Sequence, residues 1–166
     1  MGVSVKLKIY SIGILLTICA IQISAQSPEK KFKNNFYFEL FGNGFLGSFN
    51  YERILGESSI LKMGLGYVPN IENSSISAEQ VILIPIDYIH LYSFNKNVKL
   101  DIGIGVTFQF MDENYGGKDE VLINGTFGYR YQPTNGGFLF RISITPFYSF
   151  DEGFWPWFGL SFGHNF

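Results

Sequence analysis

The sequence contains few residues of several kinds on which common functions depend. Among its 166 residues there is one cysteine, Cys19, there are two histidines, and only 16% of the residues are charged. Cys19 lies in a segment that we expect to be removed, so the mature chain has no disulfide framework, no thiolate metal site and no cysteine nucleophile. The formal net charge of −2 gives no reason to expect a nucleic-acid partner.

Hydrophobic and aromatic residues are abundant instead. They make up 46% and 18% of the chain, respectively, which excludes intrinsic disorder. The length is that of one domain.

Residues 1–25 have the pattern of a secretory signal peptide. Lys6 and Lys8 form a basic start, residues 9–23 are mostly apolar, and the segment ends in small residues, which predicts cleavage after Ala25. A membrane anchor is the alternative, but the apolar stretch is interrupted by polar residues and is shorter than the roughly 20 residues that a spanning helix needs. Lipidation of Cys19 is a weaker alternative, because small residues do not precede it.

Removal of this segment leaves a chain with a formal net charge of −4, since Lys6 and Lys8 leave while all 14 acidic residues remain. Residues 26–35 are polar and predict a short periplasmic leader before a domain over residues 36–166. The longest charge-free run of the mature chain, Gly153–Phe166, is too short for a transmembrane helix.

Apolar and polar residues alternate with period two through this domain, which is typical of strands. The run from Val98 to Phe110 has every apolar side chain on one face and Lys, Asp, Gly, Thr and Gln on the other. Similar runs recur, and turn residues separate them. The pattern predicts eight strands with connections at 42–44, 55–57, 69–77, 95–97, 112–118, 133–137 and 151–153.

Eight strands joined in order favour an up-and-down barrel, and the direction of the apolar face decides its class. A soluble lipocalin-like barrel has apolar residues inside, whereas a membrane barrel has them outside. Here the polar face is also the small face, and an eight-stranded barrel has little space inside. Aromatics account for 29 of the 141 mature residues, too many for one small core. The sequence therefore predicts an all-β, eight-stranded antiparallel up-and-down transmembrane β-barrel.

Aromatic residues gather near the predicted strand ends, as in the interfacial girdles of membrane barrels. These residues are Tyr88, Tyr92, Tyr129, Tyr131, Tyr148, Trp155 and Trp157. An even number of strands places both chain ends on one side, so we expect the turns at 55–58, 95–97 and 132–137 to be periplasmic. The connections at 42–44, 69–77, 111–118 and 150–153 would then face outside the cell.

The last strand has the pattern of the C-terminal assembly signal of outer-membrane barrels, which the outer-membrane insertion machinery recognises. Its alternating apolar residues end on the chain terminus, and the predicted signal consists of Phe158, Leu160, Phe162 and Phe166. Outer-membrane lipid and the insertion machinery are therefore the partners that we expect.

Four further segments together resemble a family of small outer-membrane β-barrel proteins common in Bacteroidetes. They are residues 39–44 (ELFGNG), 48–53 (SFNYER), 128–133 with 136–141 (GYRYQP and GGFLFR) and 156–163 (PWFGLSFG). The resemblance spans nearly the whole mature chain and implies the fold and an outer-membrane location. It implies no activity, and the terminal His164-Asn165-Phe166 departs from the family's usual Tyr-x-Phe.

Charged residues lie on the predicted inner face of several strands. We expect them to form a lumen charge network of Glu39, Glu52, Asp87 and Asp101 with Lys62, Arg130 and Arg141, with Lys99 as a further member. Such a network could form an ion path. Paired charges that plug the lumen are the better interpretation, because eight strands leave no continuous channel and unpaired buried charge is costly. Trp157 is expected to add to this filling.

No catalytic, cofactor or metal site is predicted. His90 and His164 lie on outer faces near periplasmic strand ends, and the acidic residues 112, 113, 119 and 120 do not have the spacing of a calcium loop. The expected outer connections contain no histidine and no serine beside an acid, which opposes a lipid-modifying enzyme. We therefore expect a non-enzymatic barrel with a structural or surface-interaction role. A lipid-modifying enzyme and a secreted ligand-binding barrel are the alternatives.

Overall fold

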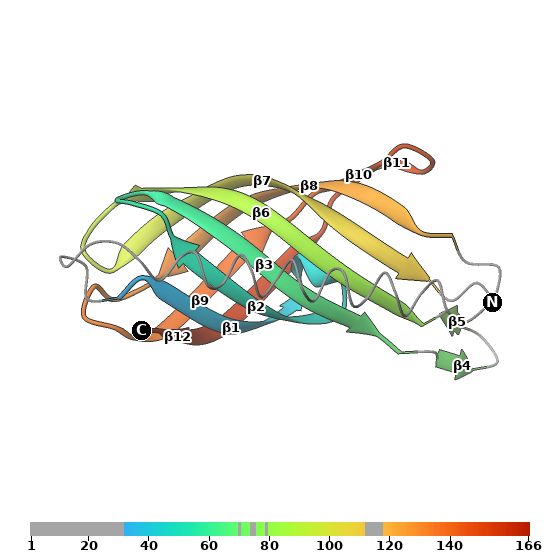
Figure 1. Ribbon diagram of the computed structural model, residues 1–166, viewed down its shortest axis with the longest axis horizontal. Helices are drawn as coiled ribbons and strands as arrows, with labels where there is room; N and C mark the ends of the chain where they lie inside the picture. The colour runs from blue at the N-terminus through green and yellow to red at the C-terminus, as the bar shows by residue number, and fades with distance from the viewer. Residues whose placement is uncertain (1–31, 70, 74–75, 79, 112–117) are drawn as a thin grey trace. The chain divides into compact units, whose positions relative to one another are not determined.

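The computed structural model describes residues 32–69, 71–73, 76–78, 80–111 and 118–166 (Figure 1). The predicted signal peptide and residues 26–31 of the predicted leader lie outside this range. Within it, no helix is long and apolar enough to cross a membrane.

The described chain forms a closed, all-β barrel of eight antiparallel strands (Figure 1). The fold class predicted from the alternating pattern is confirmed. The elements are β1 (Asn34–Phe41), η1 (Gly42–Gly44), β2 (Gly47–Ile54), β3 (Ser59–Val68), β4 (Ile71–Asn73), β5 (Ile76–Ala78), β6 (Val81–Ser93), β7 (Val98–Met111), β8 (Glu120–Tyr131), β9 (Gly137–Ile144), β10 (Phe147–Ser149), β11 (Gly153–Trp155) and β12 (Phe158–Asn165).

The first and last strands close the barrel. β1 pairs antiparallel with β12 from Asn35 opposite Asn165 to Phe41 opposite Gly159. Backbone bonds between Asn34 and Phe166, at 3.0 and 2.8 Å, extend this pairing to the chain end. Closure gives each of the eight barrel strands a partner on both sides.

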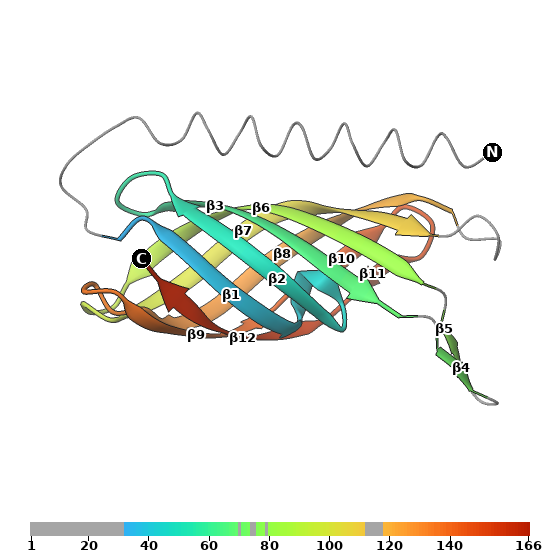
Figure 2. The same cartoon turned by 60° about the horizontal axis from the view of Figure 1, so that its bottom comes forward.

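The two ends of the barrel differ. We call the end with the short connections 55–58, 94–97 and 132–136 the turn end, and the chain finishes there. The opposite end, with connections 42–46, 69–80, 112–119 and 150–152, is the loop end. Figure 2 shows the β4–β5 hairpin projecting beyond the barrel at the loop end.

Several element boundaries differ from the prediction. β1 begins at Asn34, two residues before the expected start of the barrel. Residues 69–77, predicted to be a connection, include β4 and part of β5. The last two barrel strands are interrupted before Phe147 and before Phe158, where Pro146 and Pro156 stand. Proline has no backbone N–H to donate to a strand partner, which accounts for both interruptions.

Apolar side chains cover the outside of the barrel. The barrel strands alternate outward and inward residues, as in β8, where Phe127 and Tyr129 are exposed while Thr126 and Arg130 are buried. The exposed large apolar residues come from all eight barrel strands, and they include Phe38, Phe49, Leu65, Tyr88, Ile104, Phe127, Ile142 and Phe158. The polar face points inward. A soluble lipocalin-like barrel has the opposite arrangement.

The interior is not wholly polar, which corrects the prediction of a small, polar inner face. Ile60, Ile89 and Leu91 are buried together at the turn end, with Ile54 packed against them. Leu83, Leu122, Leu139 and Phe147 are also buried inside. Strand alternation requires these positions to face inward. Ile60, Ile89 and Leu91 fill the turn end, whereas Leu83, Leu122 and Phe147 lie toward the loop end.

Candidate functional site in the lumen and at the loop end

The seven charged residues of the predicted lumen network are all buried. Each is at most 1% exposed, and they come from β1, β2, β3, β6, β7, β8 and β9. The residues are Glu39, Glu52, Lys62, Asp87, Asp101, Arg130 and Arg141. Seven of the eight barrel strands therefore each contribute one buried charged side chain of this network to the lumen.

Arg130 is the best-connected member of the network. Its Nε and Nη2 donate to Asp101 Oδ2 at 2.8 and 2.6 Å. Its Nη1 and Nη2 donate to the two oxygens of Glu52 at 2.6 and 2.9 Å. Arg130 thus holds two carboxylates from opposite parts of the wall in paired hydrogen bonds, the strongest geometry for such a contact.

Arg141 extends the network toward the loop end. Its Nη2 donates to Glu39 Oε1 at 2.7 Å, and its Nη1 lies 3.3 Å from Glu52 Oε1 and 3.6 Å from Asp101 Oδ2. The guanidinium carbon also lies 4.9 Å from the centre of the Tyr37 ring. Tyr37, which the sequence analysis did not identify, donates its hydroxyl to Glu52 at 2.8 Å. Its position two residues before Glu39 in an alternating strand is the signal that places it inside.

Lys62 completes the network on the other side. Its Nζ lies 3.0 Å from Asp87 Oδ2 and 3.6 Å from Glu39 Oε2. Lys99, which we expected as a further member, is only half-buried. The fully buried set therefore contains four acids and three bases rather than equal numbers.

The connection between β1 and β2 folds into the barrel. Gly42, Asn43 and Gly44 of η1 are buried. Asn43 Nδ2 donates to Asp87 at 2.9 Å and lies 3.4 Å from Thr126 Oγ1, while its backbone carbonyl accepts from Thr107 at 3.4 Å. The sequence analysis expected a tight external loop here, and the structure shows a loop that occupies the lumen.

Backbone strain and close packing accompany this inward loop. Phe41 and Phe45, on either side of η1, have φ of 59° and 57°, which residues with a side chain rarely adopt. A Cβ at Gly66 of β3 would lie 2.9 Å from Gly44 Cα of η1, so position 66 must be glycine for the inward loop to pack against β3.

Together these groups occupy the lumen from the turn end to the inward loop. Apolar residues fill the turn end, the arginine–carboxylate cluster follows, and Lys62, Asp87 and Asn43 lie beyond it. Paired charges and an inserted loop favour a plug over an ion path, since the interior of eight strands has space for little besides its own side chains.

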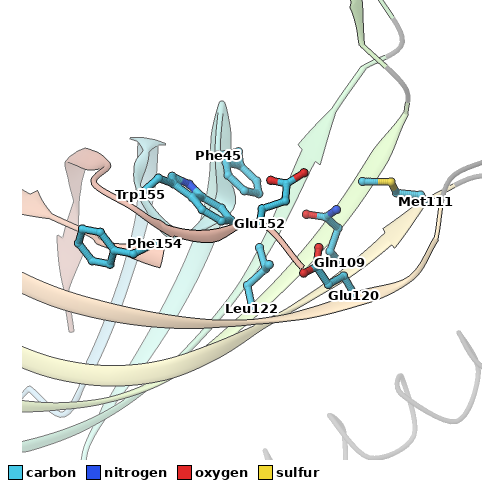
Figure 3. A pocket seen from close by; sticks show the side chains of 8 residues that line it. All are labelled: Phe45, Gln109, Met111, Glu120, Leu122, Glu152, Phe154 and Trp155. Carbon is cyan, nitrogen blue, oxygen red and sulfur yellow. The ribbon is translucent and has the colours of Figure 1, made fainter. Parts of the chain in front are cut away.

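A cavity of about 520 Å³ lies at the loop end (Figure 3). Its lining combines aromatic, acidic and amide side chains: Phe45, Gln109, Met111, Glu120, Leu122, Glu152, Phe154 and Trp155. Phe147 packs between two of these rings, with its centroid 5.1 Å from Phe45 and 5.7 Å from Trp155, in stacked geometry.

This arrangement corrects the expectation that both tryptophans belong to an outer girdle. For Trp157 it agrees instead with the second expectation, that this side chain adds to the filling of the interior. Trp155 lines the cavity, and Trp157 contacts Phe41 and Phe45 edge-on, with its indole nitrogen buried. The five tyrosines assigned to the girdle are exposed on the outside, as predicted. Both tryptophans lie next to the interruption at Pro156, where the regular alternation of inward and outward side chains is broken.

The structure also brings together a serine and an acid at the loop end, which the sequence analysis did not find. Ser149 Oγ donates to Glu120 Oε1. The same oxygen accepts the backbone N–H groups of Asp151 and Glu152 at 3.0 and 3.1 Å, and Ser149 is fully buried. A buried hydroxyl with these partners anchors a turn and has no free approach for attack on a substrate.

The two histidines are not close partners. His90 on β6 packs its ring 4.7 Å from Tyr92, while His164 lies on β12, with three barrel strands between the two in either direction. In the described part of the chain, no group of three or more His, Cys, Asp or Glu residues could hold a metal ion. Residues 112 and 113 of the acidic loop lie outside that part.

The residues of the predicted assembly signal lie along β12 and at its end. Phe158, Phe162 and Phe166 are exposed on the outer face, and Leu160 on the same face is half-buried. The strand pairs with β1 on one side and β9 on the other.

Comparisons with known proteins extend only to the fold. No protein-family model matches the sequence, and no curated protein matches it significantly. The structure is similar to the N-terminal β-barrel domain of Pseudomonas aeruginosa OprF, with a TM-score of 0.62 and 19% identity over 82% of this chain and 100% of that one. It is also similar to Ail, the attachment invasion locus protein of Yersinia pestis, with a TM-score of 0.52 and 11% identity over 81% of this chain and 97% of that one. The chain therefore has the fold of the small eight-stranded outer-membrane barrels.

Proposed function

We propose that this protein is an integral protein of the bacterial outer membrane, exported by cleavage after Ala25, with a non-enzymatic structural or surface-interaction role. The apolar outer surface of the barrel carries the proposal. Exposed rings and aliphatic chains occur on all eight barrel strands. A continuous apolar belt of this extent far exceeds the patches of a few hundred Å² that soluble monomers tolerate.

The backbone supports the same conclusion. In hydrocarbon, each unsatisfied N–H or C=O group costs several kcal/mol, so only helices and closed barrels span membranes. Pairing of β1 with β12 closes this barrel. Outer-membrane lipid is thus the partner of the outer face, and the insertion machinery is the partner of the terminal strand during assembly.

The filled lumen supports a role carried by surfaces. Arg130, Arg141 and Lys62 are bonded to carboxylates across the interior, and Asn43 is bonded above them. The loop end, which we expect to face outside the cell, offers exposed polar groups such as Asp151 and Glu152. The name of the Yersinia pestis neighbour refers to attachment, which agrees with a surface role but adds no partner for this chain.

Fractionation of cells that express the full chain tests the location. We expect the mature protein in the outer-membrane fraction, with an N-terminus at Gln26 by mass spectrometry. We also expect unheated samples to migrate differently from boiled samples in detergent gels, because a closed barrel resists detergent unfolding. Recovery in the soluble periplasm or the medium would overturn the proposal in favour of a secreted barrel.

A further inference from the structure

We propose that the loop-end cavity binds the primary ammonium group of an organic amine. The cavity measures about 520 Å³, which is enough for an ammonium group together with the carbon chain that carries it. The argument rests on the charge of the lining, on one buried amide without a partner, and on the aromatic walls.

The lining is acidic. Glu120 and Glu152 contribute two carboxylates, and no lysine, arginine or histidine is among the described residues that line the cavity. Glu120 accepts a hydrogen bond from Ser149 through one oxygen, which fixes the orientation of its carboxylate. The charge of this site attracts a cation and disfavours an anion.

Gln109 supplies an independent indication of a ligand. It is only 7% exposed and lines the cavity, yet its side chain has no hydrogen-bond partner in the described structure. The amide faces the cavity and is therefore available to a molecule that enters it. Figure 3 shows Gln109 between Glu120 and Glu152, with all three polar groups at the same cavity.

The number of acceptors favours a primary ammonium. Such a group has three N–H donors, and the cavity offers three side chains with acceptor oxygens, Glu120, Glu152 and Gln109. A quaternary ammonium has no donor and would leave these oxygens without partners. A neutral sugar would gain nothing from the negative charge of the two carboxylates.

Aromatic rings line the same cavity. Phe45 and Trp155 both stack with Phe147, and Phe154 is a third aromatic residue of the lining. Ring faces attract cations and pack against methylene chains. The ligand class is therefore an alkyl ammonium, which either a free diamine or a lysine side chain of a peptide would supply.

The chemistry of the cavity does not depend on where the protein lies, but access from outside the cell rests on the proposed function. The test therefore uses the mature chain refolded in a zwitterionic detergent, with heat-modifiable mobility as the check on folding. Cadaverine is titrated at constant ionic strength and followed by calorimetry and by tryptophan fluorescence, which Trp155 reports. Choline, trehalose and sodium chloride are titrated in parallel, as is a short lysine-containing peptide.

We expect saturable binding of cadaverine and at least about tenfold weaker binding of choline, because a charge-assisted hydrogen bond accounts for about a factor of ten or more. Glu152→Gln and Gln109→Leu should each weaken cadaverine binding by about tenfold. Glu57→Gln removes one acid from a turn-end connection and should leave binding unchanged. Tighter binding of the peptide than of cadaverine would assign the amine to a protein partner, and the reverse would assign it to a free amine.

Several results would overturn the inference. Cadaverine binding no stronger than that of sodium chloride would overturn it. Binding of trehalose or choline as tight as that of cadaverine would also overturn it. Unchanged affinity in both Glu152→Gln and Gln109→Leu would place the amine elsewhere. A protein that binds cadaverine but fractionates as soluble would keep this site and remove the proposed location.

Discussion

Arg130 and Arg141 are direct cross-strand partners in the β8–β9 register, yet both guanidinium groups lie within 3.6 Å of Glu52 and Asp101. Like charges directly opposite each other destabilise a sheet. Here carboxylates from β2 and β7 reach both arginines and offset this repulsion. The stability of the barrel therefore depends on contacts across the lumen as well as on strand pairing.

Arg130→Leu should destabilise the folded barrel by about 3–5 kcal/mol, because it leaves buried carboxylates without their partner. Urea unfolding of the protein refolded into lipid vesicles measures this loss. Lys96→Leu, an exposed position in a turn-end connection, is the matched control and should have little effect. Equal stability of the two variants would show that the network contributes nothing.

Asn43→Ala should reduce the free energy of unfolding by about 1–3 kcal/mol, since Asp87 loses a buried donor and the inward loop loses its anchor. The same urea titration measures the loss. Asn135→Ala removes an exposed amide from a turn and serves as the control. If Asn43→Ala behaves like Asn135→Ala, the inward loop is not held by this side chain.

Deletion of Phe166 should impair assembly more than deletion of any one loop. Its backbone bonds to Asn34 finish the closure of the barrel, and its exposed ring completes the predicted assembly signal. Quantification of the folded protein in outer membranes measures assembly. Phe150→Ala is the control, because Phe150 is also an exposed phenylalanine but lies at the opposite, loop end of the barrel. Normal membrane levels of the truncated chain would contradict the prediction.

Cysteine labelling should establish the orientation of the barrel. The one cysteine of the sequence, Cys19, lies in the segment that we propose is removed, so single substitutions in the barrel should give unambiguous signals. We expect Asp151→Cys at the loop end to react with an impermeant maleimide on intact cells. Asn135→Cys at the turn end should react only after permeabilisation. The opposite pattern would reverse the orientation.

The refolded protein should give no stable stepwise conductance in planar bilayers, because paired charges and the inward loop occupy the lumen. It should also turn over no lipid in hydrolysis and acyl-transfer assays, because Ser149 is buried in turn contacts. Stable conductance would restore the ion-path interpretation. Lipid turnover abolished by Ser149→Ala would restore the enzyme interpretation.

The sequence alone was sufficient to predict the barrel and the direction of its faces. Period-two alternation is a local property, so each strand shows independently which side chains share a face. The same parity placed all seven network charges inside. The strand interruptions at Pro146 and Pro156 and the inward-facing Ile60, Ile89 and Leu91 could also have been predicted from the sequence. They were missed because the prediction assigned a single polarity to each face of a strand.

Tertiary structure alone decided which groups meet. Glu52 is the register partner of Lys62, but Lys62 binds Asp87 and Glu39, while Glu52 binds arginines 78 and 89 residues away. Such contacts depend on the tilt and stagger of strands around the closed barrel, which no local pattern encodes. The inward turn of Asn43 and the pairing of Glu120 with Ser149 arise in the same way. Alternation determines that a side chain faces the lumen, and closure of the barrel determines what it contacts there.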